Sequence, residues 1–104
     1  EQDYEKAREW YMKAANQGYA NAQNNLGNMY ESGKGVEQDY EKAREWYMKA
    51  ANQGYANAQN NLGNMYESGK GVEQDYEKAR EWYMKAANQG FTISQDNLKA
   101  IQDK

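Results

Sequence analysis

Apolar residues recur at helical spacing along most of the chain. In the run DYEKAREWYMKAANQG, which begins at Asp39, apolar side chains lie three or four residues apart and share one helix face. The next run, ANAQNNLGNMYES, does the same and fills its outer positions largely with asparagine. The first stripe consists of Tyr40, Ala43, Tyr47, Ala50 and Ala51, widened by Trp46, and the second of Ala58, Leu62, Met65 and Tyr66. The pattern predicts helices at about 4–17, 20–32, 39–53, 56–68, 75–89 and 94–102.

Residues at the expected helix ends support these boundaries. Asp39 can cap a helix start, because its carboxylate can accept from free amides of the first turn. Gly54 suits the left-handed residue that often follows a helix. Gly63 falls in mid-helix, where glycine costs about 1 kcal/mol relative to alanine. We therefore expect a neighbouring helix to approach closely at Gly63.

The chain is an internal repeat. Residues 1–36 and 37–72 are identical, and 73–90 repeat 1–18. A period of 36 is typical of helical solenoids, which need an atypical, polar last element. The last segment is a degenerate copy, in which Lys99 replaces Gly27 and Gln102 replaces Tyr30. We predict an all-α, right-handed solenoid of about six helices, a single domain over 1–104 with units 1–36, 37–72 and 73–90 and a capping helix in 91–104.

The repeated unit resembles the Sel1-like repeat, a longer relative of the tetratricopeptide repeat. The resemblance covers residues 1–90 and implies a solenoid of antiparallel helix pairs that binds proteins and does not catalyse a reaction. The residues that match the family pattern are Ala22, Leu26, Gly27, Tyr30, Gly33, Gly35, Val36, Asp39, Lys42, Ala43, Trp46, Tyr47, Lys49, Ala50, Ala51 and Gly54.

The identical sequences of the repeats bear on whether the chain is engineered or natural. Natural repeats drift, so identity across residues 1–90 favours an engineered consensus array without a dedicated native ligand. The alternative is a fragment of a natural adaptor that binds a peptide or protein on its concave face.

The amino-acid composition argues against several classes of function and partner. The chain has no cysteine and no histidine, which removes thiolate nucleophiles, imidazole bases and the usual zinc ligands. We therefore expect no enzyme, no cofactor and no metal site. With 13 basic and 16 acidic residues, a net charge of −3 makes a nucleic-acid partner unfavourable. No apolar run approaches the ~20 residues of a membrane span and no signal-peptide pattern is visible, so we expect a soluble protein without membrane partners.

Three motifs have a chemical and a structural interpretation. Gly33-Lys34-Gly35 resembles a phosphate loop, but the spacing is one residue too long and no hydroxyl follows the lysine. We interpret it as a helix end and a turn, with Val36 tucked under the helix pair. The Tyr and Trp series could stack on bases or sugars, but its helical spacing favours a core. The acidic cluster Glu37, Asp39 and Glu41 lacks the calcium-loop signature and suits a helix start.

The asparagine-rich face is the candidate interaction site. In the related repeats the first helix of each pair lines the concave side, and asparagine both donates and accepts hydrogen bonds. A ladder of such groups could bind an extended peptide, while the alternative is a generic solvated surface. Some relatives grip a peptide carboxylate with Lys and Arg, but Asn24, Asn25, Asn57, Asn60 and Asn61 hold those positions here, so we predict no such clamp. The candidate contacts are Asn21, Asn24, Asn28, Glu31, Ser32, Asn57, Asn60, Asn64, Glu67 and Ser68, which we expect to be exposed.

The first expected helix raises a separate hypothesis. The pattern begins on the second helix of a pair, so we expect helix 4–17 to leave part of Tyr4, Trp10, Tyr11 and Ala14 uncovered. An exposed apolar patch usually finds a partner. Head-to-tail stacking of molecules is one explanation, and a trimmed chain is the other.

Overall fold

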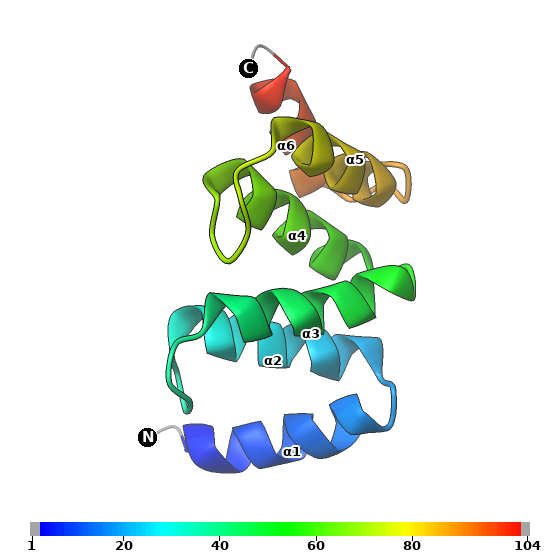
Figure 1. The fold of residues 1–104 in the computed structure, drawn as a ribbon. Coiled ribbons are helices and arrows are strands. Elements are labelled where there is room, and N and C mark those ends of the chain that lie inside the picture. Colours follow the sequence, from blue (N-terminus) through cyan, green and yellow to red (C-terminus); the bar gives the residue numbers. More distant parts are fainter. Residues whose placement is uncertain (1–2, 103–104) are drawn as a thin grey trace.

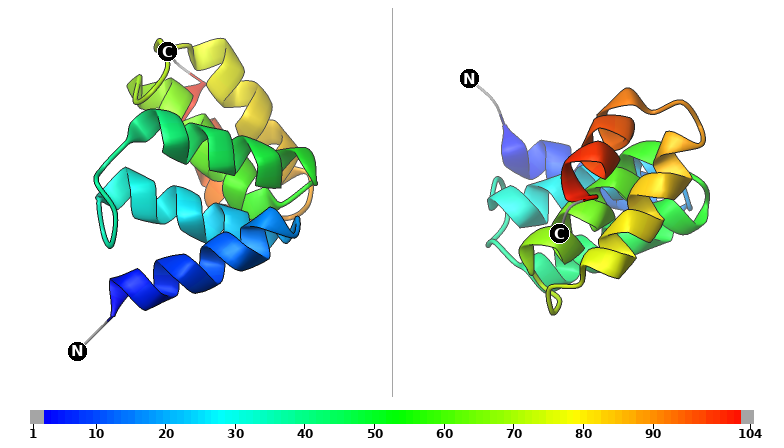
Figure 2. Two further views of the ribbon diagram at one scale, coloured as in Figure 1. Left: turned by 60° about the horizontal axis from the view of Figure 1, so that its bottom comes forward. Right: turned by 90° about the horizontal axis from the view of Figure 1, so that it is seen from above.

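The computed structural model describes residues 3–102, and this part of the chain contains six helices and no strand. The helices stack in chain order into an α-solenoid, with α1 and α6 at opposite ends (Figures 1 and 2). Every predicted helix is present, and each boundary lies within two residues of its predicted position. The helices are α1 Tyr4–Asn16, α2 Ala20–Ser32, α3 Tyr40–Asn52, α4 Ala56–Ser68, α5 Tyr76–Ala87 and α6 Thr92–Ile101.

The starts of α1, α3 and α5 carry the predicted cap. The Asp39 carboxylate accepts from the backbone amide of Lys42 at 3.1 Å, and Asp3 and Asp75 do the same in α1 and α5. This hydrogen bond satisfies one of the amides that a helix start leaves without a partner, and it contributes about 1 kcal/mol.

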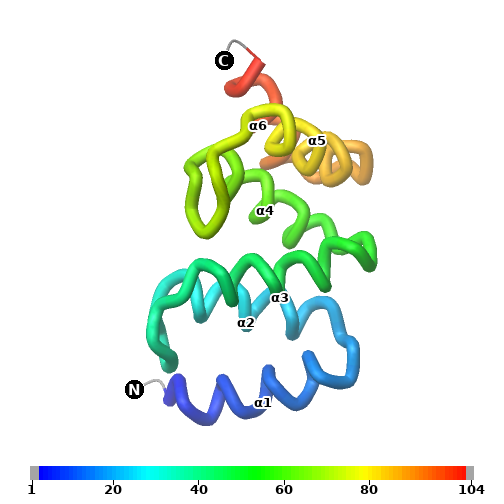
Figure 3. The backbone as a smooth tube through the Cα atoms, viewed as in Figure 1, coloured from blue at the N-terminus to red at the C-terminus, as the bar shows by residue number. Residues whose placement is uncertain are grey.

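The Gly33-Lys34-Gly35 segment ends α2 and turns the chain toward α3. Gly33 has φ 75° and Gly35 has φ 79°, a left-handed conformation that favours glycine. Val36 is half-buried against the Leu26 cluster, and Lys34 is exposed. A helix precedes the segment, and Figure 3 shows the resulting loop and its copy after α4. The structure agrees with the interpretation as a helix end and turn.

The predicted apolar stripes form the core. Tyr47 and Tyr83 have no exposed surface, and neither do Leu26 and Leu62. Trp46 is half-buried and packs against the Leu26 cluster. The prediction that the regularly spaced aromatics belong to the core is therefore confirmed for these positions.

Mid-helix glycines allow the closest helix approach. A Cβ added at Gly63 would lie 2.5 Å from Cδ1 of Tyr83, and closer still to Cε1. Gly27 stands in the same relation to Tyr47. Real Cβ contacts are not so short, so only glycine lets α2 lie against α3 and α4 against α5 at this distance. The expected close approach at Gly63 is confirmed.

Candidate functional site

The asparagine-rich face divides into exposed and buried positions. Asn24 and Asn60 are 6% and 5% exposed, so the prediction that they face solvent is wrong. Glu31 and Glu67 are half-buried. The remaining candidates are exposed as predicted: Asn21, Asn28, Ser32, Asn57, Asn64 and Ser68.

Asn24 and Asn60 are buried because they join consecutive repeats. The Asn61 Nδ2 in α4 donates to Oδ1 of Asn24 in α2 at 3.0 Å. The Asn97 Nδ2 in α6 donates to Oδ1 of Asn60 at 3.0 Å, and the Ser94 hydroxyl donates to the same oxygen at 2.7 Å. A buried amide needs such partners, because an unsatisfied polar group costs about 1–3 kcal/mol. One sequence signal points to this role: Asn97 keeps the asparagine of Asn61 in a last copy where, over 91–104, only Gln95 and Leu98 are also kept.

Asn28 and Glu31 bind the buried tyrosine of the following helix. The Tyr47 hydroxyl donates toward Oδ1 of Asn28 at 2.6 Å and Oε1 of Glu31 at 2.7 Å. Asn64 and Glu67 stand at the same distances from the Tyr83 hydroxyl. Burial raises the pKa of Tyr47 well above its ordinary value, and the hydrogen bond to Glu31 and the charge of that carboxylate add to the rise. These candidate residues therefore have a structural role within the stack.

A glutamine ladder, which the sequence did not single out, links the repeats along a second line. The Gln53 Nε2 donates to Oε1 of Gln23 at 2.9 Å. Gln23 in turn donates to the Ala15 carbonyl at 3.1 Å. Gln89 and Gln59 repeat the first contact at 3.0 Å. Glutamine is common on exposed helix faces, so spacing alone did not indicate that Gln23 and Gln59 are buried.

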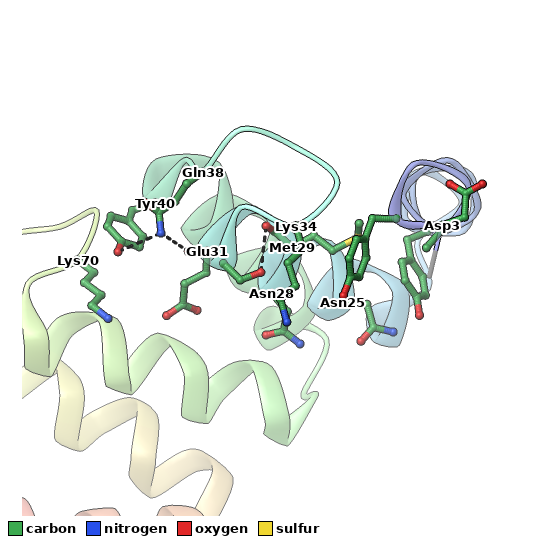
Figure 4. Close-up of a pocket in the computed structure, with 13 residues that line it drawn as sticks. Asp3, Asn25, Asn28, Met29, Glu31, Lys34, Gln38, Tyr40 and Lys70 are labelled. Carbon is green, nitrogen blue, oxygen red and sulfur yellow. Dashed lines mark hydrogen bonds between the residues drawn. The ribbon is translucent and has the colours of Figure 1, made fainter. Parts of the chain in front are cut away.

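A groove of about 890 Å³ lies over α1, α2 and the start of α3 (Figure 4). Its walls combine apolar surface from tyrosine and methionine with amides and charges of both signs. At its rim, Gln38 Nε2 donates to the Glu31 carbonyl at 2.7 Å and contacts the Tyr40 hydroxyl at 3.3 Å. The lining residues are Asp3, Tyr4, Ala7, Tyr11, Asn25, Asn28, Met29, Glu31, Ser32, Lys34, Gln38, Tyr40 and Lys70.

Three predicted contacts meet in this groove, namely Asn28, Glu31 and Ser32. Asn21 of α2 and Asn57 of α4 do not line it, although both are exposed. The groove can hold apolar and amide groups of a polypeptide. Within residues 3–102, no group of three or more acidic side chains is placed to hold a metal ion. No helix in that part of the chain is long and apolar enough to cross a bilayer.

The outer side of α1 is uncovered. Trp10 is 75% exposed and Tyr4 is 38% exposed, while Tyr11 and Ala14 are half-buried. The aligned residues of α3 are better covered, since Tyr47 and Ala50 have no exposed surface. The expected partial exposure of this helix is therefore confirmed.

Repeated antiparallel helix pairs, joined by ladders of identical contacts, define a helical-repeat protein of the tetratricopeptide-like class. The family model described as Sel1 repeat matches residues 1–19, 20–55 and 56–91. The chain belongs to the Sel1 repeat family, which is a family of protein-interaction repeats.

Solved structures agree with this assignment. A protective antigen of uropathogenic Escherichia coli, which displays this repeat fold, is 47% identical with a TM-score of 0.91, over 93% of this chain and 21% of its own length. A Sel1 repeat protein from Oxalobacter formigenes is 38% identical with a TM-score of 0.91, and the match covers 100% of this chain and 43% of that protein. Helicobacter pylori cysteine rich protein B is 29% identical with a TM-score of 0.87, and the match covers 93% of this chain and 73% of that protein.

The chain thus spans about a fifth of the first of these structures and under half of the second. A search of the curated proteins gave no match.

Proposed function

We propose that the chain is a non-catalytic scaffold that presents the same interaction surface once per repeat. The observation that supports this proposal most directly is the recurrence of exposed amides at one register, with Asn21 and Asn28 in α2 matched by Asn57 and Asn64 in α4. The repeat family supports the interaction role, and the mixed lining of the groove supports a polypeptide partner.

Within this function we infer a consensus array without a dedicated ligand. Residues 1–36 and 37–72 are identical even at exposed positions such as Glu41, Glu45, Asn21 and Asn57. Packing does not require identity at exposed positions, so a shared template explains it better than independent drift. The coding DNA tests this inference: codons varied between identical repeats indicate synthesis, and drifted repeats flanking the sequence in a genome contradict it.

The exposed amides favour a second candidate, an adaptor that binds an extended peptide. Asn21 and Asn57 lie one repeat apart on the candidate face, and both side chains are exposed. Screening an immobilised random-peptide library against the full chain tests this role. If a peptide binds to the exposed amides, the double variant Asn21→Ala/Asn57→Ala should weaken its binding. The control Glu45→Ala/Glu81→Ala, which changes exposed residues of α3 and α5, should leave binding unchanged. Equal effects of the two double variants contradict the adaptor.

The uncovered side of α1 supports an additional association surface. Tyr4 and Tyr11 line the groove, and Trp10 of the same helix is largely exposed. We propose that this surface binds a helix from another protein. Head-to-tail stacking of a second copy of the chain is the alternative, and sedimentation velocity distinguishes the two.

A further inference from the structure

The uncovered side of α1 has two covered copies in the same molecule. Ala7 and Tyr11 of α1 align with Ala43 and Tyr47 of α3. In α3 these residues have no exposed surface, because α2 lies across them. In α1 both are half-buried and line the groove. The interfaces between α2 and α3 and between α4 and α5 therefore show what fits on this side of α1.

Each covering helix contributes three features. It places a glycine against the tyrosine ring, since a Cβ at Gly27 would lie 2.5 Å from Cδ1 of Tyr47. It then supplies two acceptors for the tyrosine hydroxyl, Asn28 at 2.6 Å and Glu31 at 2.7 Å. The same arrangement recurs where α4 covers Tyr83.

A fourth contact completes the match. Asn24 of α2 accepts a hydrogen bond from Asn61 at 3.0 Å. Asn25 aligns with Asn61 and lines the groove beside Tyr11. A helix seated on α1 in the same register would bring its own asparagine within reach of Asn25.

The geometry points to a seat for one kind of helix in this groove: a helix with the sequence pattern of α2, whose glycine faces Tyr11 and whose asparagine and glutamate accept from the Tyr11 hydroxyl. This inference rests on the association surface proposed above and names its partner by chemistry. Its second part is that α6 of another copy is excluded from the seat by two residues, Lys99 and Ala100.

The exclusion follows from the alignment of α6 with α2 and α4. Lys99 occupies the position of Gly27 and Gly63, and Ala100 occupies the position of Asn28 and Asn64. Both residues are exposed on α6. A side chain at position 99 would overlap the Tyr11 ring, and Ala100 offers no side-chain acceptor for its hydroxyl. The chain as it stands is therefore expected to stay monomeric despite the exposed side of α1.

Sedimentation velocity of the full chain tests the exclusion. The triple variant Lys99→Gly/Ala100→Asn/Gln102→Tyr restores the glycine, asparagine and tyrosine of the α2 pattern, and Asp103 already provides a carboxylate at the sequence position of Glu31. Its sedimentation coefficient should therefore rise with concentration. The matched triple variant Lys99→Ala/Ala100→Asn/Gln102→Tyr differs by one methyl group, and it should associate at least about tenfold more weakly because that methyl overlaps the ring. The unmodified chain should sediment as a monomer.

The inference is overturned if the unmodified chain assembles head to tail or if the two triple variants associate equally. It is also overturned if the glycine variant stays monomeric with an unchanged circular dichroism spectrum. Tyr11→Ala in the glycine variant should abolish its association, and association that persists also counts against the seat.

The seat can be tested without α6 if the triple variants unfold. A copy of residues 20–36 fused before Glu1 restores the repeat register, and it should shift Trp10 emission to shorter wavelength as the indole becomes covered. The same extension with alanine at the position of Gly27 should give a smaller shift, and equal shifts overturn the seat. Asn21 and Asn57, which the peptide-binding test changes, do not line the groove. Failure of peptide binding at these two amides therefore leaves the seat unaffected, and failure of the seat leaves peptide binding at these amides unaffected.

Discussion

Replacing Gly63 by alanine sets two known effects against each other. Alanine favours the helix by about 1 kcal/mol relative to glycine. The new methyl group, however, would lie 2.5 Å from Cδ1 of Tyr83 and 3.0 Å from its Cζ. Tyr83 has no exposed surface, and its hydroxyl is held by Asn64 and Glu67. The ring can therefore move only by displacing packed neighbours or by losing those hydrogen bonds.

The packing cost is expected to exceed the gain in helix propensity. Overpacking a well-filled core costs about 1–3 kcal/mol, and one lost hydrogen bond to a charged group costs about 1.5–3 kcal/mol. Because the Tyr83 ring has no exposed surface, we take the upper part of the overpacking range, about 2–3 kcal/mol; after the propensity gain of about 1 kcal/mol, Gly63→Ala should lower the free energy of unfolding by about 1–2 kcal/mol. For a domain of this length, that loss lowers Tm by roughly 5–10 °C.

Urea denaturation followed by circular dichroism at 222 nm measures the effect. Position 99 supplies the matched control, because Lys99 is exposed on α6 and aligns with Gly63. There, Lys99→Ala should be about 1 kcal/mol more stable than Lys99→Gly, since only propensity acts. A Gly63→Ala chain as stable as the unmodified protein, with the control behaving as stated, would refute the packing argument.

The hydrogen bonds within and between the helices also have measurable effects on stability. Raising the pH above about 10 should destabilise the fold, because burial and a neighbouring carboxylate raise the pKa of Tyr83 and the folded state keeps a proton that the unfolded state loses. In urea denaturation at a series of pH values, the free energy of unfolding should fall less steeply with pH in Tyr83→Phe, by up to about 1.4 kcal/mol per pH unit. The control Tyr19→Phe, which changes an exposed residue, should keep the slope of the unmodified protein. Asn60→Ala should lower the free energy of unfolding by about 1–3 kcal/mol, because it leaves the Ser94 and Asn97 donors without their acceptor. The control Asn57→Ala, which changes an exposed residue, should alter it by under about 0.5 kcal/mol. Equal losses in the two variants would contradict the structural role of Asn60. Asp39→Ala should cost about 1 kcal/mol in the same assay through loss of the helix cap, and Asp39→Ser should recover most of it.

The fold was predictable because its determinants are local and repeated. Apolar spacing gave the six helices, and the cap at Asp39 and the glycine at position 33 gave their ends. A period of 36 residues then required each pair to stack on the next. Even the close contact at Gly63 was expected, because a mid-helix glycine in a packed helix needs a neighbour to explain it.

The candidate site was predictable only in part. Helical spacing places Asn21, Asn24 and Asn28 on one side of α2, and it treats them alike. The structure separates them, because α4 crosses α2 at Asn24 and leaves Asn21 exposed. The sequence also did not indicate the structural role of Asn28, whose side-chain oxygen accepts a hydrogen bond from the Tyr47 hydroxyl on the next helix.

The positions of the helices, their ends and the order of stacking follow from residue spacing within one or two repeats, so they can be predicted from the amino-acid sequence. Which amides link repeats and which face solvent depends instead on tertiary contacts. Burial of a polar side chain depends on which neighbouring helix crosses it. For Asn24 that is α4 of the next repeat, through Asn61, which lies 37 residues further along the chain. The asparagines are chemically identical, so their partners across the stack give them different roles.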